Sequence, residues 1–440
     1  MDRPATAEDV LDAQLEGDRS LKPGSARAAL SYPMFRRVYF GSLGSNVGTW
    51  MQNVVLTAYA WVLTGDPAFV ALMGFVQLGP LALSPIGGTI ADRYDRRRLL
   101  MGISVFQAFA AMALALVTLA ADPNRLALLG TVFVISLGQA VNGPTFSATL
   151  PTLVRAEDLS GAVSLTSANM NVSRVLGSMI GPAIYAGFGV SWVFALNGLT
   201  YFFIVVALWT VRVPSPTVRD DGLSAIGRVL EGFRIAKRDR IVVRILTTVA
   251  VFSFCSLIFI TQMPTLAEEH LGVDPESGTY GLLFASFGLG AVVGALSVGS
   301  VFVGRRFEPL VRINLVLFAL LLAVWTLNTS LAAAFPIGFA LGIVYFIVIT
   351  VLSTALQSRI ANATRGRIMA LWIMCYGGTV PIGNLVAGPI INATSLTAVL
   401  VFGAAVAVAL SFYARGLDEP APAEVAAELN PAPAPPAGTR

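Results

Sequence analysis

Long apolar runs separated by short polar segments fill the chain from residue 38 to residue 412. A run of about twenty apolar residues is long enough for a helix to cross the hydrocarbon core of a bilayer. The pattern predicts twelve such helices in two sets of six, at residues 38–63, 69–90, 99–119, 126–150, 159–188 and 192–211, then at 241–266, 281–303, 309–327, 331–356, 368–390 and 396–412. We therefore expect an all-α membrane protein.

Charged residues between these runs alternate in sign. Arginines gather after the even-numbered runs, for example at residues 93–98 and 305–312, while Asp66, Asp122 and Glu268 follow odd-numbered runs. Short basic loops stay on the cytoplasmic side of a membrane. This distribution predicts a multi-pass membrane protein with both termini in the cytoplasm.

The two sets of runs predict five parts of the chain. They are a disordered cytoplasmic segment at 1–34, a six-helix half at 35–212, a cytoplasmic linker with a basic amphipathic helix at 213–240, a second six-helix half at 241–414, and a disordered Pro/Ala-rich cytoplasmic tail at 415–440. Gly181-Pro182 in the fifth run recurs 207 positions later as Gly388-Pro389 in the eleventh. This recurrence favours two halves related by pseudo-symmetry.

Composition narrows the classes of function. Hydrophobic residues make up 55% of the 440 residues and charged residues 12%, with a mean hydropathy of +0.74, which excludes an ordinary soluble protein. No basic stripe lies on a soluble domain, so nucleic acid is not an expected partner. The sequence shows no metal-ligand spacing, phosphate-binding loop or nucleophile–base set, so we expect no metal, no cofactor and no enzymatic activity.

The loop after the second run carries the pattern G-x-x-x-D-R-x-x-R-R from Gly88 to Arg97. It resembles the signature between helices two and three of the major facilitator superfamily. Further segments resemble the enterobactin-exporter-like (transmembrane secretion effector) branch, among them Gly48-Thr49-Trp50-Met51-Gln52 and Asn142-Gly143-Pro144. The resemblance implies the twelve-helix fold of that superfamily, a monomer, and export of siderophores or hydrophobic drugs. It also implies a location in the bacterial cytoplasmic (inner) membrane.

Two groups of residues are predicted to act in gating. The first is the loop itself, where glycine allows close helix packing and charges can hold facing helices, with Asp92 expected against the span that starts near Arg365. The second comprises the two Gly-Pro pairs. The gating candidates are Gly88, Asp92, Arg93, Arg96, Arg97, Gly181, Pro182, Gly388 and Pro389. The alternative is that the loop charges only fix topology.

Polar residues inside the runs form stripes, which face either a cavity or another helix. Arg174 is the charged residue placed deepest in a run, and intramembrane charges are costly enough to mark functional candidates. The expected contacts of a small-molecule substrate are Arg174, Asn46, Gln52, Gln139, Asn171, Trp372 and Tyr376. Hydrogen bonding between helices is the alternative explanation for each polar residue.

Taken together, the patterns predict a secondary transporter that resides in the lipid bilayer. It is expected to export a small hydrophobic or anionic compound, such as a siderophore, antibiotic or drug, by alternating access. Two alternatives remain open from the sequence: an uptake transporter of the same fold, and a membrane sensor or scaffold that transports nothing.

Overall fold

The computed structural model describes residues 17–18, 20–211, 225–302, 305–360 and 364–419. These residues form helices and turns, with no β-strand among them. The chain divides into two compact units, which are described separately below. The first contains residues 1–221 and 262–288, and the second contains residues 222–261 and 289–440.

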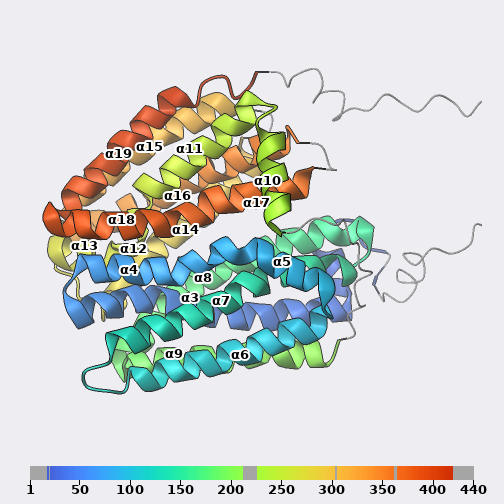
Figure 1. The fold of residues 1–440 in the computed structure, drawn as a ribbon, viewed down its shortest axis with the longest axis horizontal. Coiled ribbons are helices and arrows are strands. Elements are labelled where there is room, and N and C mark those ends of the chain that lie inside the picture. The colour runs from blue at the N-terminus through green and yellow to red at the C-terminus, as the bar shows by residue number, and fades with distance from the viewer. Residues whose placement is uncertain (1–16, 19, 212–224, 303–304, 361–363, 420–440) are drawn as a thin grey trace, which may run out of the picture. The chain divides into compact units, whose positions relative to one another are not determined.

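The first unit is a helical bundle around α3, which packs against α8 and α9, while α6 packs against α7 and α9 (Figure 1). A 3₁₀ turn, Gly79–Leu83, joins α4 to α5. The helices are α2 (Ala26–Ser31), α3 (Pro33–Thr64), α4 (Pro67–Leu78), α5 (Ser84–Arg93), α6 (Arg96–Val117), α7 (Arg125–Thr149), α8 (Leu159–Phe188), α9 (Val190–Trp209), α13 (Met263–Leu271) and the start of α14 (Gly278–Ser300).

The second unit is built around α11, which packs against α18 and α19, while α15 packs against α16 and α19. A π-helical turn, Met374–Gly378, joins α17 to α18. Besides the rest of α14, the helices are α10 (Ala225–Ala236), α11 (Arg240–Ser256), α12 (Ile258–Thr261), α15 (Phe307–Leu327), α16 (Leu331–Gln357), α17 (Arg365–Ile373), α18 (Thr379–Ala393) and α19 (Leu396–Tyr413).

The same packing pattern recurs in both units, and glycine makes it possible. A Cβ at Gly177 of α8 would lie 2.5 Å from the Trp50 Cβ of α3, and one at Gly181 would lie 2.9 Å from Met51 Cα. In the second unit a Cβ at Gly383 of α18 would lie 2.2 Å from the Phe254 carbonyl oxygen of α11. The fifth and eleventh predicted spans therefore each approach the first helix of their own half closely enough for backbone contact.

Ten helical segments among the described residues are long and apolar enough to cross a membrane. The long helices α3 and α8 are not among the ten, so the predicted count of twelve is not confirmed. Both carry many polar side chains, which lower the mean hydropathy of helices 32 and 30 residues long. The predicted span 159–188 coincides with α8, whereas the predicted span 241–266 is divided between α11, α12 and α13.

The prediction of disorder at 1–34 is wrong for the part of this segment that is described, because Ser25 caps α2. The backbone N–H of Gly24 and the hydroxyl of Tyr32 donate hydrogen bonds to the buried carboxylate of Asp158, at 2.9 and 2.7 Å. Burial, together with the bond to Asp158, raises the pKa of Tyr32 to about 12. Residues 1–16 lie outside the described residues.

The predicted disordered tail also begins too early. Leu417 is 1% exposed, and the Asp418 carboxylate accepts the backbone N–H groups of Phe307 and Glu308 at the start of α15. A carboxylate at a helix N-terminus satisfies amides that have no partner within the helix. The chain is therefore held as far as Glu419, and residues 420–440 lie outside the described residues.

Candidate functional site

Arg174 lies midway along α8 and is held against an aromatic ring. Its guanidinium carbon lies 4.7 Å from the ring centroid of Trp50 on α3. An arginine over the face of tryptophan gains a cation–π attraction that grows when water is excluded. The contact orders a long side chain inside the bundle before any ligand arrives.

On the N-terminal side of Trp50 and Arg174, amide side chains link α3 to α8. The Asn46 amide donates to Asn169 Oδ1 at 3.0 Å, and Asn169 in turn donates to Ser42 Oγ at 3.0 Å and to the Tyr39 carbonyl at 3.2 Å. Asn169 is 2% exposed, so this network is internal. Asn46 is half-buried at its edge and is the member best placed to exchange a protein partner for a ligand.

The remaining polar candidates of the first unit have different surroundings. Gln52 is 3% exposed and accepts a 2.8 Å hydrogen bond from Asn197 of α9, which gives it a structural contact inside the bundle. Gln139 of α7 donates a long, 3.5 Å bond to the hydroxyl of the buried Tyr201. Asn171 donates to the Ser167 carbonyl of its own helix. Gln139 and Asn171 are half-buried and therefore remain candidates for contact with a ligand.

The predicted gating loop connects α5 to α6. Arg96 donates to the Ala148 carbonyl at the end of α7 at 2.9 Å, and lies 3.9 Å from Asp92. Arg97 donates to the carbonyls of Leu208 and Trp209 at the end of α9, both at 2.8 Å. Arginines near helix C-termini satisfy carbonyls that have no partner within their helix.

The other members of the loop have different environments. Arg93 is exposed. A Cβ at Gly88 would find Pro144 at an ordinary 4.0 Å, whereas one at the adjacent Gly87 would lie 2.3 Å from the Ala140 carbonyl. The close approach of α5 to α7 therefore depends on Gly87. The predicted contact of Asp92 with the start of α17 stays a prediction.

The Gly-Pro pair of α8 contacts a segment from much later in the chain. A Cβ at Gly281 of α14 would lie 2.9 Å from the Pro182 ring and 2.8 Å from the Ser178 carbonyl. Helix α8 continues through Pro182 without a break. In α18, Gly388 is buried and Pro389 is exposed, and that helix is also continuous.

Three hydrogen bonds hold the same late segment, 262–288, in the first unit. Trp61 Nε1 donates to Glu268 Oε2 at 2.6 Å, the Tyr185 hydroxyl donates to Glu276 Oε1 at 2.8 Å, and the Gln262 amide donates to the Pro67 carbonyl at 2.9 Å. We call these bonds the α13–α14 anchors. Two of them end on carboxylates, which strengthens a hydrogen bond.

In the second unit the aromatic candidates form a cluster around the π-helical turn. The rings of Trp372 and Tyr376 stack with centroids 6.2 Å apart, and the Tyr376 hydroxyl shares a 2.6 Å hydrogen bond with that of Tyr345. Trp372 is 6% exposed. π-Helical turns are rare and occur frequently at functional sites.

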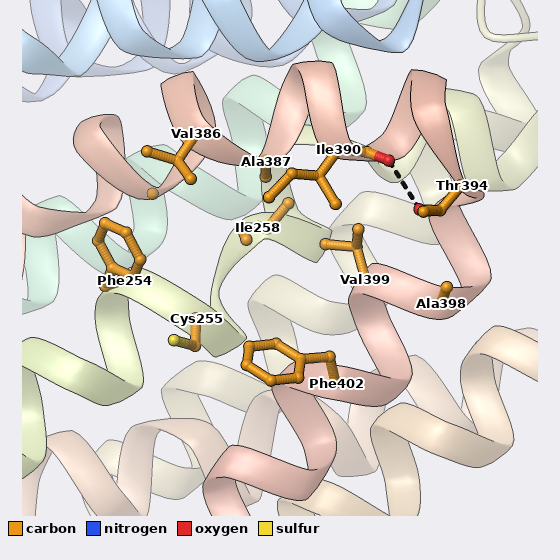
Figure 2. A pocket seen from close by; sticks show the side chains of 11 residues that line it. Phe254, Cys255, Ile258, Val386, Ala387, Ile390, Thr394, Ala398, Val399 and Phe402 are labelled. Carbon is orange, nitrogen blue, oxygen red and sulfur yellow. Dashed lines mark hydrogen bonds between the residues drawn. The ribbon is translucent and has the colours of Figure 1, made fainter.

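An apolar groove of about 210 Å³ lies between α11, α12, α18 and α19 in the second unit. Figure 2 shows Phe254, Ile390 and Phe402 around it, with the Thr394 hydroxyl turned back to the Ile390 carbonyl. Phe402 is 61% exposed and Ile390 is 46% exposed. The groove thus opens on an apolar surface and offers almost no polar group to orient a ligand.

Some participants could not be recognised from the sequence pattern. Trp50 lies 124 positions from Arg174, and Asn169 and Asn197 lie more than a hundred positions from their partners on α3. Asn169 lies outside the polar stripe expected on α8, and no pattern in the sequence indicated that it faces α3. Among the described residues, no three His, Cys, Asp or Glu side chains lie close enough to hold a metal ion.

Known proteins resemble the chain along most of its length. The family model for transmembrane secretion effectors matches residues 24–435. The enterobactin exporter EntS of Escherichia coli O1:K1 / APEC is 27% identical over 369 residues, which cover 78% of this chain and 81% of that protein. The enterobactin exporter EntS of Citrobacter koseri is 26% identical over 367 residues, with the same coverage.

Solved transporters share the fold at low sequence identity. The nucleoside transporter NupG aligns with a TM-score of 0.70 and 12% identity, covering 88% of this chain and 99% of that one. The inward-open xylose transporter XylE from E. coli aligns with a TM-score of 0.68 and 12% identity, covering 90% and 99%. These likenesses show the fold and carry no information about the substrate.

Proposed function

The chain belongs to the transmembrane secretion effector family of the major facilitator superfamily, and on that premise we propose that it exports a small siderophore-like compound by alternating access. The relatives named above are enterobactin exporters. Family membership implies a transporter and not an enzyme. The orientation that we propose places both termini in the cytoplasm, following the alternation of basic and acidic loops.

The observation that carries the substrate assignment is the Arg174–Trp50 pair. A guanidinium offers a fork of donors suited to carboxylates and other paired oxygens, and Trp50 holds it in place beforehand. A group ordered in advance loses less conformational entropy when its ligand binds. We therefore assign the recognition of an anionic or electron-rich oxygen group to Arg174, with Asn46, Gln139 and Asn171 as supporting polar contacts.

The aromatic residues of the second unit form a separate candidate surface for apolar or aromatic groups. Trp372 and Tyr376 present stacked rings, and the Tyr345–Tyr376 hydroxyl pair adds a donor and an acceptor. Flat apolar or aromatic parts of a substrate bind well on such surfaces. Gln52 is proposed to act structurally, through Asn197.

Flux into inside-out vesicles tests the proposal. The probes are a siderophore bearing a free carboxylate and its methyl ester, which keeps the shape and removes the charge. We expect Arg174→Gln to slow flux of the acid roughly tenfold to a hundredfold and to change flux of the ester much less, since a charge-assisted bond to a buried group is lost. Arg174→Lys, which keeps charge without the fork, should fall between.

Arg125 provides the matched control. Its guanidinium carbon lies 5.9 Å from the Phe69 ring centroid in the same unit, so Arg125→Gln removes a cation–π contact of the same kind near the end of a helix. Equal slowing of acid and ester by Arg174→Gln, with folding intact, would make Arg174 structural. No flux of any probe in the parent protein would refute export itself.

A further inference from the structure

Helix α10 joins the two halves of the sequence and is fastened on one side to α17, as Figure 1 shows. A Cβ at Gly232 would lie 2.9 Å from the Arg367 carbonyl, and Ala236 is 3% exposed. Glu231 Oε1 accepts a 2.9 Å ion-pair hydrogen bond from Arg367. One face of α10 therefore packs against α17, the helix that leads into the aromatic cluster of Trp372 and Tyr376.

Another face of α10 is exposed and mixes apolar with basic side chains. Leu230 is 61% exposed and Phe233 is 45% exposed. Arg234 is exposed beside them, at a three- or four-residue step that places side chains on one helix face. Lys237 and Arg238 follow in the turn directly after α10 and are exposed as well. We call these five residues the α10 stripe.

The charge of the stripe is not balanced by the acids of its own segment. Glu231 is engaged with Arg367, and Asp239 is 3% exposed and paired with Arg359 at 2.9 Å. The exposed surface therefore carries three cations. The partner that such a surface favours is an anionic one.

The position of the α10 stripe indicates which class of anion it binds. Only Lys237, Arg238 and Asp239 separate α10 from α11, whose segment Arg240–Thr261 is one of the candidate spans. The stripe is therefore held at the level of the membrane surface. Exposed leucine and phenylalanine among lysine and arginine are typical of a helix that lies in the headgroup region, with its apolar side chains entering the acyl boundary.

We propose that the α10 stripe binds the headgroups of anionic phospholipids in the inner leaflet, and that this binding steadies α17 through the Glu231–Arg367 pair. The proposal rests on the cytoplasmic orientation proposed above, and not on the identity of the substrate. The linker would then do more than connect the two halves, because lipid binding to α10 would stabilise α17, the helix that carries Trp372.

The first test measures binding without transport. A fluorophore sensitive to polarity is attached to Leu230→Cys in a Cys255→Ala/Cys375→Ala background, and the protein is placed in phosphatidylethanolamine vesicles with or without phosphatidylglycerol. We expect a blue shift that grows with phosphatidylglycerol. Arg234→Gln/Lys237→Gln/Arg238→Gln should weaken the affinity for anionic lipid, roughly fivefold per charge removed, and should show little or no shift at the phosphatidylglycerol content that shifts the parent.

The matched control removes three exposed arginines from the first unit, as Arg27→Gln/Arg36→Gln/Arg98→Gln. The shift should then match that of the parent. An equal loss in both triple variants would mean that the whole basic face acts by general electrostatics, and would overturn the proposal. Absence of any shift with phosphatidylglycerol in the parent would also overturn it.

The second test concerns transmission. Glu231→Gln keeps the stripe and weakens its link to α17, so the fluorescence shift should persist while flux loses its dependence on phosphatidylglycerol. Flux that depends on the anionic lipid in this variant as strongly as in the parent would refute the link to α17. Because the fluorescence shift needs no substrate, failure of the proposed export function would leave the binding result intact.

Discussion

In each unit a buried carboxylate fixes the start of the first long helix, and we call this contact the tie of the unit. The partner of the carboxylate differs between the two units. In the first unit Tyr32, directly before α3, donates to Asp158, which lies between α7 and α8. In the second unit Asp239, directly before α11, pairs with Arg359, which lies between α16 and α17. Tyr32 and Asp239 are 207 positions apart, the separation that also relates Gly181 to Gly388.

The two ties therefore occupy matching positions in the two units but consist of different chemical groups. The Asp158 carboxylate accepts hydrogen bonds from a neutral phenol and from one backbone amide. Asp239 and Arg359 are two buried charges, which are stable together and costly apart because each has lost its hydration. Arg359 also donates to the carbonyl of Glu419, so the second tie also includes the segment that follows α19. The second unit should therefore be the more sensitive to a single substitution at this place.

The largest effect is expected when the ion pair is broken from one side. Arg359→Met leaves the buried Asp239 carboxylate without its arginine, although the Ile241 backbone N–H still donates to it, and should lower the free energy of unfolding by about 3–5 kcal/mol. Asp239→Asn/Arg359→Met should regain much of the loss. Thermal unfolding in detergent measures both, and a single variant as stable as the parent would show that the pair is dispensable.

A smaller loss is expected where both units rely on glycine. Gly181→Ala and Gly383→Ala place a methyl group against backbone atoms of α3 and α11, and should each cost about 2–3 kcal/mol through overpacking. Gly143→Ala is the control, because its Cβ would meet nothing within 4 Å. If the two units pack equally tightly, the two losses will agree. Unequal losses of stability in thermal unfolding would show that one unit accommodates the added methyl group more easily than the other.

The tie of the first unit should be cheaper to break. Tyr32→Phe removes the donor to Asp158 and leaves the bond from Gly24, so we expect a loss of about 1–2 kcal/mol. Tyr94→Phe, at a tyrosine that is 62% exposed, should be neutral. A cost for Tyr32→Phe as large as that of Arg359→Met would remove the contrast drawn between the two units.

The smallest effect concerns the α13–α14 anchors, which hold segment 262–288 in the first unit. Glu268→Gln and Glu276→Gln keep an acceptor and remove the charge that strengthens each bond. We expect hydrogen exchange of α13 to accelerate several-fold. Glu269→Gln, on the same helix, should leave exchange unchanged; the same acceleration there would assign the effect to net charge.

Much of this architecture follows from the sequence because membrane helices must be long and apolar. The predicted span 331–356 agrees with α16 to within one residue, and the deep arginine predicted on 159–188 is the one that lies over Trp50. The prediction of disorder before residue 35 failed for a different reason. Helix α2 is held by Asp158, more than a hundred positions away, and composition carries no trace of such a contact.

The site was harder to predict than the fold. A polar stripe predicts which face of a helix is special, yet Gln52 and Asn46 have their hydrogen-bond partners on α9 and α8, respectively. The packing of the helices decides whether a polar side chain forms a hydrogen bond with another amide or stays accessible to a ligand, and the sequence pattern alone does not show this. The π-helical turn escaped prediction as well, since Met374–Gly378 differs from ordinary helix in its hydrogen bonds and not in its residue types.

That π-helical turn also bears on how insertions and deletions act in this span. A π turn holds one residue more than an α turn because its hydrogen bonds reach one residue further along the chain. Removing one residue from Met374–Gly378 would therefore restore a regular helix and keep the same face of α18 toward α11. Removing one residue from the regular part of α17 would instead rotate all that follows by about 100°, and Gly383 would leave the Phe254 carbonyl. The π turn is thus the point in this span where a deletion of one residue should be tolerated best.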